Sequence, residues 1–115
     1  MRVAAVMTDL MLYSRIDSVA IAAGATLIRI DTPSALPDDL DLVLVDWSTR
    51  QADWADALRA RTATRVILVG QHTDLEAHAA ARAAGLGPMW ARSKLLASIA
   101  EILAAPTFAV RFPDR

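Results

Sequence analysis

An aspartate directly follows a short apolar run in the middle of the chain, and this residue is the strongest candidate for a chemical role. In LVLVDW, residues 42–47, four apolar residues precede Asp46. A carboxylate at the end of a buried strand can act as a nucleophile or metal ligand, or it can cap the amides of the next turn. Arg92 follows another apolar run, at 88–91. We expect Asp46 and Arg92 to lie within salt-bridge reach, because an unpaired buried carboxylate is costly.

The other chemically capable residues are better explained by structural roles. His72 and His78 are six residues apart, which is not the i, i+4 spacing that places two ligands on one helical face, so we predict no metal site there. Asp9 and Asp74 each precede a helical pattern, where aspartate favours the N-cap. No Walker loop, GxGxxG motif or nucleophile elbow occurs. We therefore predict neither a cofactor nor enzymatic activity.

The composition excludes several classes of partner. Twelve basic and thirteen acidic residues give a net charge of −1, and no basic patch predicts direct binding to nucleic acid. The chain has no cysteine for thiolate chemistry, and it has no signal-peptide pattern. No apolar run approaches the roughly 18 to 20 residues of a membrane span, so we expect a cytoplasmic protein. The three tryptophans favour core or interface positions over a binding platform; they are Trp47, Trp54 and Trp90.

Apolar runs alternate with helical patterns along the chain. Continuous runs are typical of parallel strands that are covered on both faces. The predicted strands are 3–6, 26–30, 42–45, 66–69 and 88–91, and the predicted helices lie within 12–23, 54–58, 75–83 and 95–103. Gly24 and Gly85 are placed to end the first and third helices. The order β-α-β-β-α-β-α-β-α predicts an alternating α/β architecture.

Two segments depart from this alternation. The connection DTPSALPDDLD, residues 31–41, contains two prolines and leaves room for about one helical turn, so this crossover should be short and mostly extended. After the predicted domain at 1–105, the tail at 106–115 alternates Phe108, Val110 and Phe112, which is the period of a half-buried strand. We expect the tail to pack at a sheet edge or across a homodimer contact.

This pattern resembles the receiver domain of bacterial response regulators. The resemblance covers about residues 2–105 and is most specific in VLVDW at 43–47 and in AARAAGLGPMWARSKLLASIAEIL at 80–103. It implies a flavodoxin-like, doubly wound, five-stranded parallel sheet of order 2-1-3-4-5, here with a shortened or missing second helix. In receivers the aspartate that ends the third strand accepts a phosphoryl group, and the matching residue is Asp46.

The metal-binding acids of the family are replaced. Receivers end the first strand with an acid pair, and the matching residues here are Met7 and Thr8, followed by Asp9. Mg²⁺ requires oxygen ligands, carboxylates among them, so a thioether is no ligand and a neutral hydroxyl is a poor substitute. The resemblance therefore implies a damaged metal site.

The remaining switch positions also differ from the family. Gly70 replaces the serine or threonine that contacts the phosphoryl group, and Arg92 replaces the lysine that follows the fifth strand. Arginine keeps the charge but does not reproduce a compact ammonium. Met89 replaces the switch aromatic, with Trp90 beside it. Together these changes predict a receiver-like domain that is degenerate in its phosphorylation site.

Three functions are consistent with these residues. We favour a stand-alone signalling or scaffold domain that acts by protein–protein contact, independently of phosphorylation, through the last two helices and the fifth strand at 74–105, including contact with a second copy. The first alternative is a phosphoacceptor in which Asp9 and Asp46 hold the metal. The second is a small-molecule binder or enzyme that uses a strand-end pocket formed by Asp9, Gly70 and Arg92.

Overall fold

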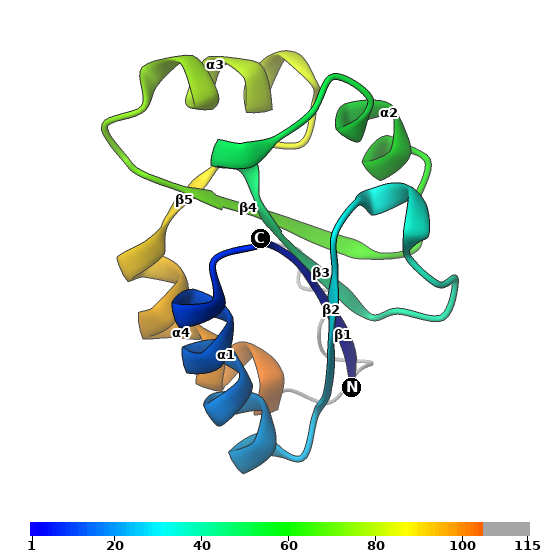
Figure 1. Ribbon diagram of the computed structural model, residues 1–115, viewed down its shortest axis with the longest axis vertical. Helices are drawn as coiled ribbons and strands as arrows, with labels where there is room; N and C mark the ends of the chain where they lie inside the picture. The colour runs from blue at the N-terminus through cyan, green and yellow to red at the C-terminus, as the bar shows by residue number, and fades with distance from the viewer. Residues whose placement is uncertain (105–115) are drawn as a thin grey trace.

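A computed structural model describes residues 1–104, which form a five-stranded parallel sheet with helices on both faces (Figure 1). The strands are β1 (Arg2–Val6), β2 (Thr26–Ile30), β3 (Leu42–Asp46), β4 (Arg65–Gly70) and β5 (Trp90–Ala91). Their order is β2-β1-β3-β4-β5, which confirms the predicted flavodoxin-like fold. The predicted boundary at 105 and the predicted packing of the tail lie outside the described residues.

The helices are α1 (Leu10–Ala23), α2 (Trp54–Arg59), α3 (Leu75–Ala83) and α4 (Arg92–Ala104), with short 3-10 turns η1 (Pro33–Ala35) and η2 (Trp47–Thr49). Only η1 stands between β2 and β3, so the predicted short crossover is confirmed. Pro33 is the first residue of that turn, where the fixed φ of proline favours a helical start. Among residues 1–104, no helix is long and apolar enough to cross a membrane.

The core has two layers because strand side chains alternate between the faces of the sheet. Val3 and Ala5 of β1 point into the layer beneath α1 and α4, whereas Ala4 and Val6 point into the layer beneath η1, α2 and α3. In Figure 1, α1 and α4 lie side by side on one face. Since β1 and β3 are buried on both faces, they carry the continuous apolar runs that predicted them.

The first helix is positioned by its two caps. Asp9 accepts hydrogen bonds from the backbone N–H groups of Met11 and Leu12, so the predicted N-cap is confirmed. Gly24 ends the helix with a φ of 73°, a left-handed conformation that glycine adopts without steric cost. The helix therefore starts directly beyond the carboxyl end of β1, which places Asp9 beside the ends of the neighbouring strands.

Two elements differ from their predicted form. β5 consists of Trp90 and Ala91 alone rather than 88–91; Pro88 has no N–H group to donate to a strand ladder. The spacing of Leu75, Ala79 and Ala83 predicted α3, yet these side chains are exposed, and the buried positions of the helix are Ala77 and Ala81. Alanine occupies both faces of this helix, so its periodicity could not identify the buried face.

Candidate functional site

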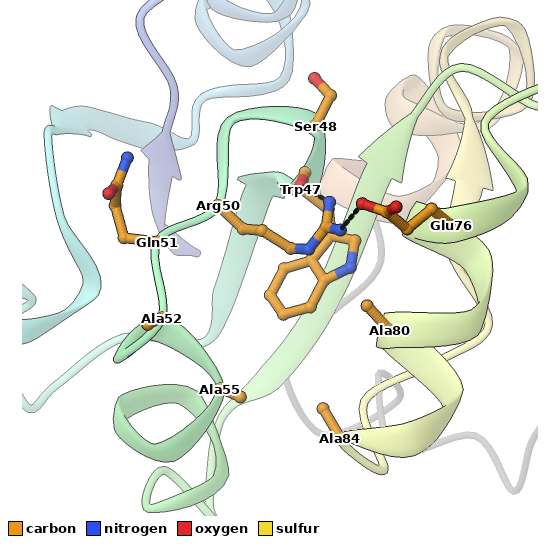
Figure 2. A pocket seen from close by; sticks show the side chains of 9 residues that line it. All are labelled: Trp47, Ser48, Arg50, Gln51, Ala52, Ala55, Glu76, Ala80 and Ala84. Carbon is orange, nitrogen blue, oxygen red and sulfur yellow. Dashed lines mark hydrogen bonds and ion pairs between the residues drawn. The ribbon is translucent and has the colours of Figure 1, made fainter.

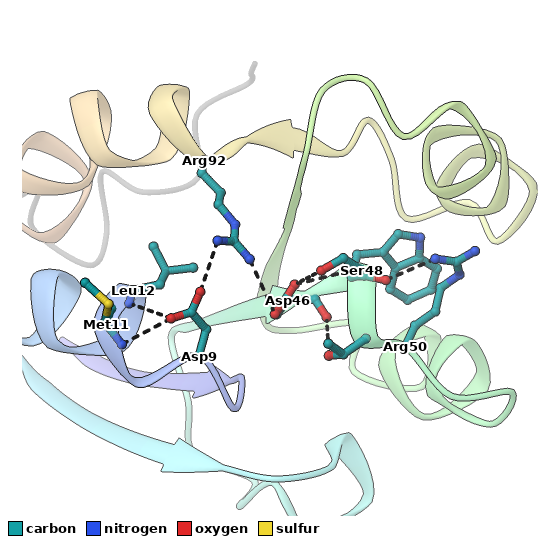
Figure 3. Close-up of polar contacts among 9 residues, drawn as sticks. Asp9, Met11, Leu12, Asp46, Ser48, Arg50 and Arg92 are labelled. Carbon is teal, nitrogen blue, oxygen red and sulfur yellow. Dashed lines mark hydrogen bonds and ion pairs between the residues drawn. The ribbon is translucent and has the colours of Figure 1, made fainter.

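The carboxyl ends of β1, β3 and β5 meet in a cluster of three charged side chains (Figure 3). Arg92 donates a hydrogen bond from Nη1 to Oδ2 of Asp9 at 3.0 Å, and its Nη2 lies 3.9 Å from Oδ2 of Asp46. Figure 3 shows the guanidinium extending from the start of α4 toward both carboxylates. The predicted Asp46–Arg92 pair is thus present, with Asp9 as a second partner of the same arginine.

Asp46 both caps the turn that follows it and pairs with Arg92. Its side chain is only 3% exposed, and Oδ1 accepts hydrogen bonds from the hydroxyl and the backbone N–H of Ser48, the latter at 3.3 Å. These bonds cap η2, while Oδ2 faces Arg92. Oδ1 is therefore hydrogen-bonded, and the charge of Oδ2 is compensated by the Arg92 guanidinium.

Asp9 is held as a carboxylate by its surroundings. The backbone N–H of Leu12 is the largest influence and holds the pKa of Asp9 below its usual value. Partial burial opposes this, and Arg92 and the N–H of Met11 lower the pKa further. The Asp9 side chain is 31% exposed, so water has access to this end of the cluster but hardly to Asp46.

The residues that occupy the family's acid-pair positions do not fit a divalent cation. Met7 is 1% exposed and packs within the core layer beneath α1 and α4, while Thr8 is exposed. Within residues 1–104, no three histidine, aspartate or glutamate side chains gather closely enough to hold a metal ion. The cation beside Asp46 and Asp9 is instead the guanidinium of Arg92.

Gly70 and Met89 are in direct contact at the end of β4. Met89 is 4% exposed and belongs to the core layer beneath α2 and α3. A Cβ atom added to Gly70 would lie 2.7 Å from the Met89 sulfur, closer than real side chains approach. Any larger residue at position 70 therefore requires Met89 to move. Gly70 and Met89, which look like two separate departures from the receiver sequence, therefore belong to one packing arrangement.

The remaining candidates take structural positions. Nε2 of His78 lies 3.0 Å from the backbone oxygen of His72, a local contact, and Asp74 caps α3 through the N–H of Ala77. Trp47 and Trp54 are buried in the core layer beneath α2 and α3, and Trp90 is half-buried against the other layer. The sequence reasoning missed Ser48, although serine two residues after an aspartate is a known turn signal.

Comparison with known proteins gives matches among solved structures alone. No family model and no curated protein matches the sequence. A response regulator receiver protein from Burkholderia phymatum is 18% identical, with a TM-score of 0.65 over 91% of this chain and 96% of that one. The chain has the receiver fold.

Two further structures give the same result. A response regulator receiver domain protein from Clostridium thermocellum is 14% identical, with a TM-score of 0.61 over 90% of this chain and 93% of that one. A CpaE2 pilus assembly protein from Sinorhizobium meliloti is 17% identical, with a TM-score of 0.56 over 86% of this chain and 97% of that one. The receiver fold thus extends over nearly the whole of the described chain.

Proposed function

We propose that this protein is a cytoplasmic, non-enzymatic receiver-like domain for signalling or scaffolding that acts by protein–protein contact and does not depend on phosphorylation of Asp46. The observation that carries the proposal is that Met7, buried in the core, and Thr8 stand where receivers carry their metal-binding acids. Phosphoryl transfer to a carboxylate needs a free carboxylate oxygen and a divalent cation that neutralises the phosphoryl charge. Here the guanidinium supplies a fixed positive charge in the same cluster.

The bonds of Asp46 support this reading. For Asp46 to attack a phosphorus atom, the phosphoryl group would have to reach Oδ2 beside the Arg92 guanidinium, because Oδ1 is hydrogen-bonded to Ser48. The Asp46 side chain is 3% exposed, so it offers an incoming phosphoryl group little open surface. Gly70 and Met89 also leave no hydroxyl and no aromatic ring to respond to a modified aspartate.

We propose that the partner surface is formed by α3, β5 and α4. Its strongest support is Leu75, whose residue surface is 77% exposed at the start of α3. Ala79 and Ala83 follow at intervals of four residues and are also exposed, so the three residues form an apolar stripe on one face of the helix. Burying Leu75 and the alanine surface beside it against a partner would remove apolar area from water, which favours association. The partner is another protein or a second copy of this chain.

A matched pair of substitutions tests this surface. Ile21, on α1, is 72% exposed and serves as the control for Leu75. The full chain and the variants Leu75→Lys and Ile21→Lys would be used to capture proteins from the native cell, and sedimentation of each would report self-association. We expect Leu75→Lys alone to lose the contact. Equal behaviour of the two variants would place the contact elsewhere on the protein.

A further inference from the structure

A groove of about 470 Å³ lies between α2 and α3 (Figure 2). These helices cover the face of the sheet opposite to α1 and α4 (Figure 1). Alanines form both of its walls: Ala52 and Ala55 on the α2 side, and Ala80 and Ala84 on the α3 side. Figure 2 shows the indole of Trp47 between these walls. Because an alanine side chain ends at Cβ, the two helices leave space between them that larger residues would fill.

A preorganised arginine lies at one end of this groove. The Arg50 guanidinium lies 5.5 Å from the centroid of the Trp47 ring, and Nη1 donates to the Trp47 carbonyl at 3.2 Å. Trp47 is itself fixed, because it is 2% exposed and its Nε1 donates to the Ala77 carbonyl at 3.1 Å. The Arg50 side chain is 22% exposed. Its planar fork is thus held in one place before any ligand arrives.

The partner of this arginine is held loosely. Nη2 of Arg50 lies 3.6 Å from Oε1 of Glu76, whose side chain is 92% exposed. Exposed ion pairs contribute little to stability, because water stabilises the free carboxylate almost as well as the arginine does. An incoming carboxylate that excludes water from the groove would gain more from Arg50 than Glu76 does.

We propose that the groove binds an acidic segment of a partner protein. An aliphatic side chain of that segment lies between the alanine walls, and its carboxylate replaces Glu76 at Arg50. The charge of the fixed guanidinium selects the acid, and the small walls select an aliphatic neighbour. This inference rests on the proposal that the protein works by protein contact, and it adds a second surface and the chemistry of the partner.

The groove is also connected to the charged cluster at the strand ends. Ser48 lines the groove and binds Asp46 through its hydroxyl and its backbone N–H. Trp47 follows Asp46 directly and begins η2. A segment that binds in the groove therefore contacts the same turn that Asp46 caps, so its binding should shift the amide signals of Asp46 and Ser48.

The test is an NMR titration of the isotopically labelled full chain with two short blocked peptides. One peptide alternates leucine and glutamate, and the other alternates leucine and glutamine. We expect the glutamate peptide to shift the amides of residues 46–52 and 76–84 and to bind about tenfold more tightly than the glutamine peptide, as expected of a charge-assisted hydrogen bond. Equal binding of the two peptides, or shifts elsewhere, would overturn the proposal.

Four variants assign any binding to the groove. Arg50→Gln should abolish the preference for glutamate, whereas Glu76→Gln should tighten binding by about twofold to fivefold, because it removes the competing carboxylate. Ala80→Leu should block the groove; Ala22→Leu is its control, since Ala22 is exposed on α1, outside the groove lining and outside the surface of α3, β5 and α4. Weaker binding by Glu76→Gln, or equal effects of the two leucine variants, would contradict the proposal. Neither result would restore a phosphorylation-dependent function, which a phosphoryl mimic tests separately.

Discussion

Met89 lies so close to Gly70 that a Cβ atom placed on the glycine would be 2.7 Å from the methionine sulfur. In receivers these two positions hold the hydroxyl residue and the aromatic residue of the switch. Here the buried thioether adjoins the space that a side chain at position 70 would enter. The two residues are therefore compatible with each other, and restoring one of them alone should strain the core.

The first prediction concerns this contact. Gly70→Ala should lower the free energy of unfolding by about 1 kcal/mol, the lower end of the usual cost of overpacking, because the flexible end of the buried Met89 side chain must shift. The same substitution in a Met89→Ala background should cost less, since the sulfur is then absent. Urea unfolding of the four proteins forms a double-mutant cycle. An equal cost in both backgrounds would show that the contact is not tight.

The second prediction concerns the charged cluster. Arg92→Gln should lower the free energy of unfolding by about 1–3 kcal/mol, because it leaves the Asp46 carboxylate buried without its charged partner. The control is Arg59→Gln: Arg59 pairs with the exposed Asp56 and donates one hydrogen bond to the Ala84 carbonyl, so the loss should be about 1 kcal/mol. Urea unfolding measures both variants. A smaller loss at Arg92 than at Arg59 would contradict the clustered geometry.

The third prediction concerns acid stability. The N–H of Leu12 and then Arg92 lower the pKa of Asp9 in the folded protein. A lowered carboxyl pKa contributes stability that is present above the unfolded value, about 3.9, and is lost as the pH falls through the folded value. Below about pH 4, the wild type should therefore lose stability more steeply than Asp9→Asn. Urea unfolding at several pH values over this window measures both proteins. If the free energy of unfolding falls with pH equally in both, the pKa of Asp9 is not lowered on folding.

Much of the fold follows from local patterns in the sequence. The apolar runs of β1 and β3 are continuous because both faces are buried, and Gly24 ends α1 in the left-handed conformation that its position predicts. Asp46 and Arg92 were predicted to pair because parallel strands bring their carboxyl ends to one edge. These predictions succeed because each depends on one element or on the strand order.

Other features depend on contacts between elements and had no local signal. The buried face of α3 was ambiguous because alanine lies on both of its faces. The contact between Gly70 and Met89 depends on how β4 meets the segment before β5, and the spacing of the two residues does not reveal it. The arrangement of Arg50 on Trp47 likewise depends on the path of η2.

The measurement that tests the central claim most directly is an amide NMR titration of the full chain with beryllofluoride and millimolar Mg²⁺. Arg92 bridges Asp9 and Asp46, and Met7 is buried where receivers carry a metal-binding acid. We therefore predict an essentially unchanged spectrum, because Met7 and Thr8 do not supply the acid pair that would hold the cation, and Gly70 offers no hydroxyl to the mimic. Saturable shifts centred on Asp46 would contradict the account and would make the protein a phosphoacceptor.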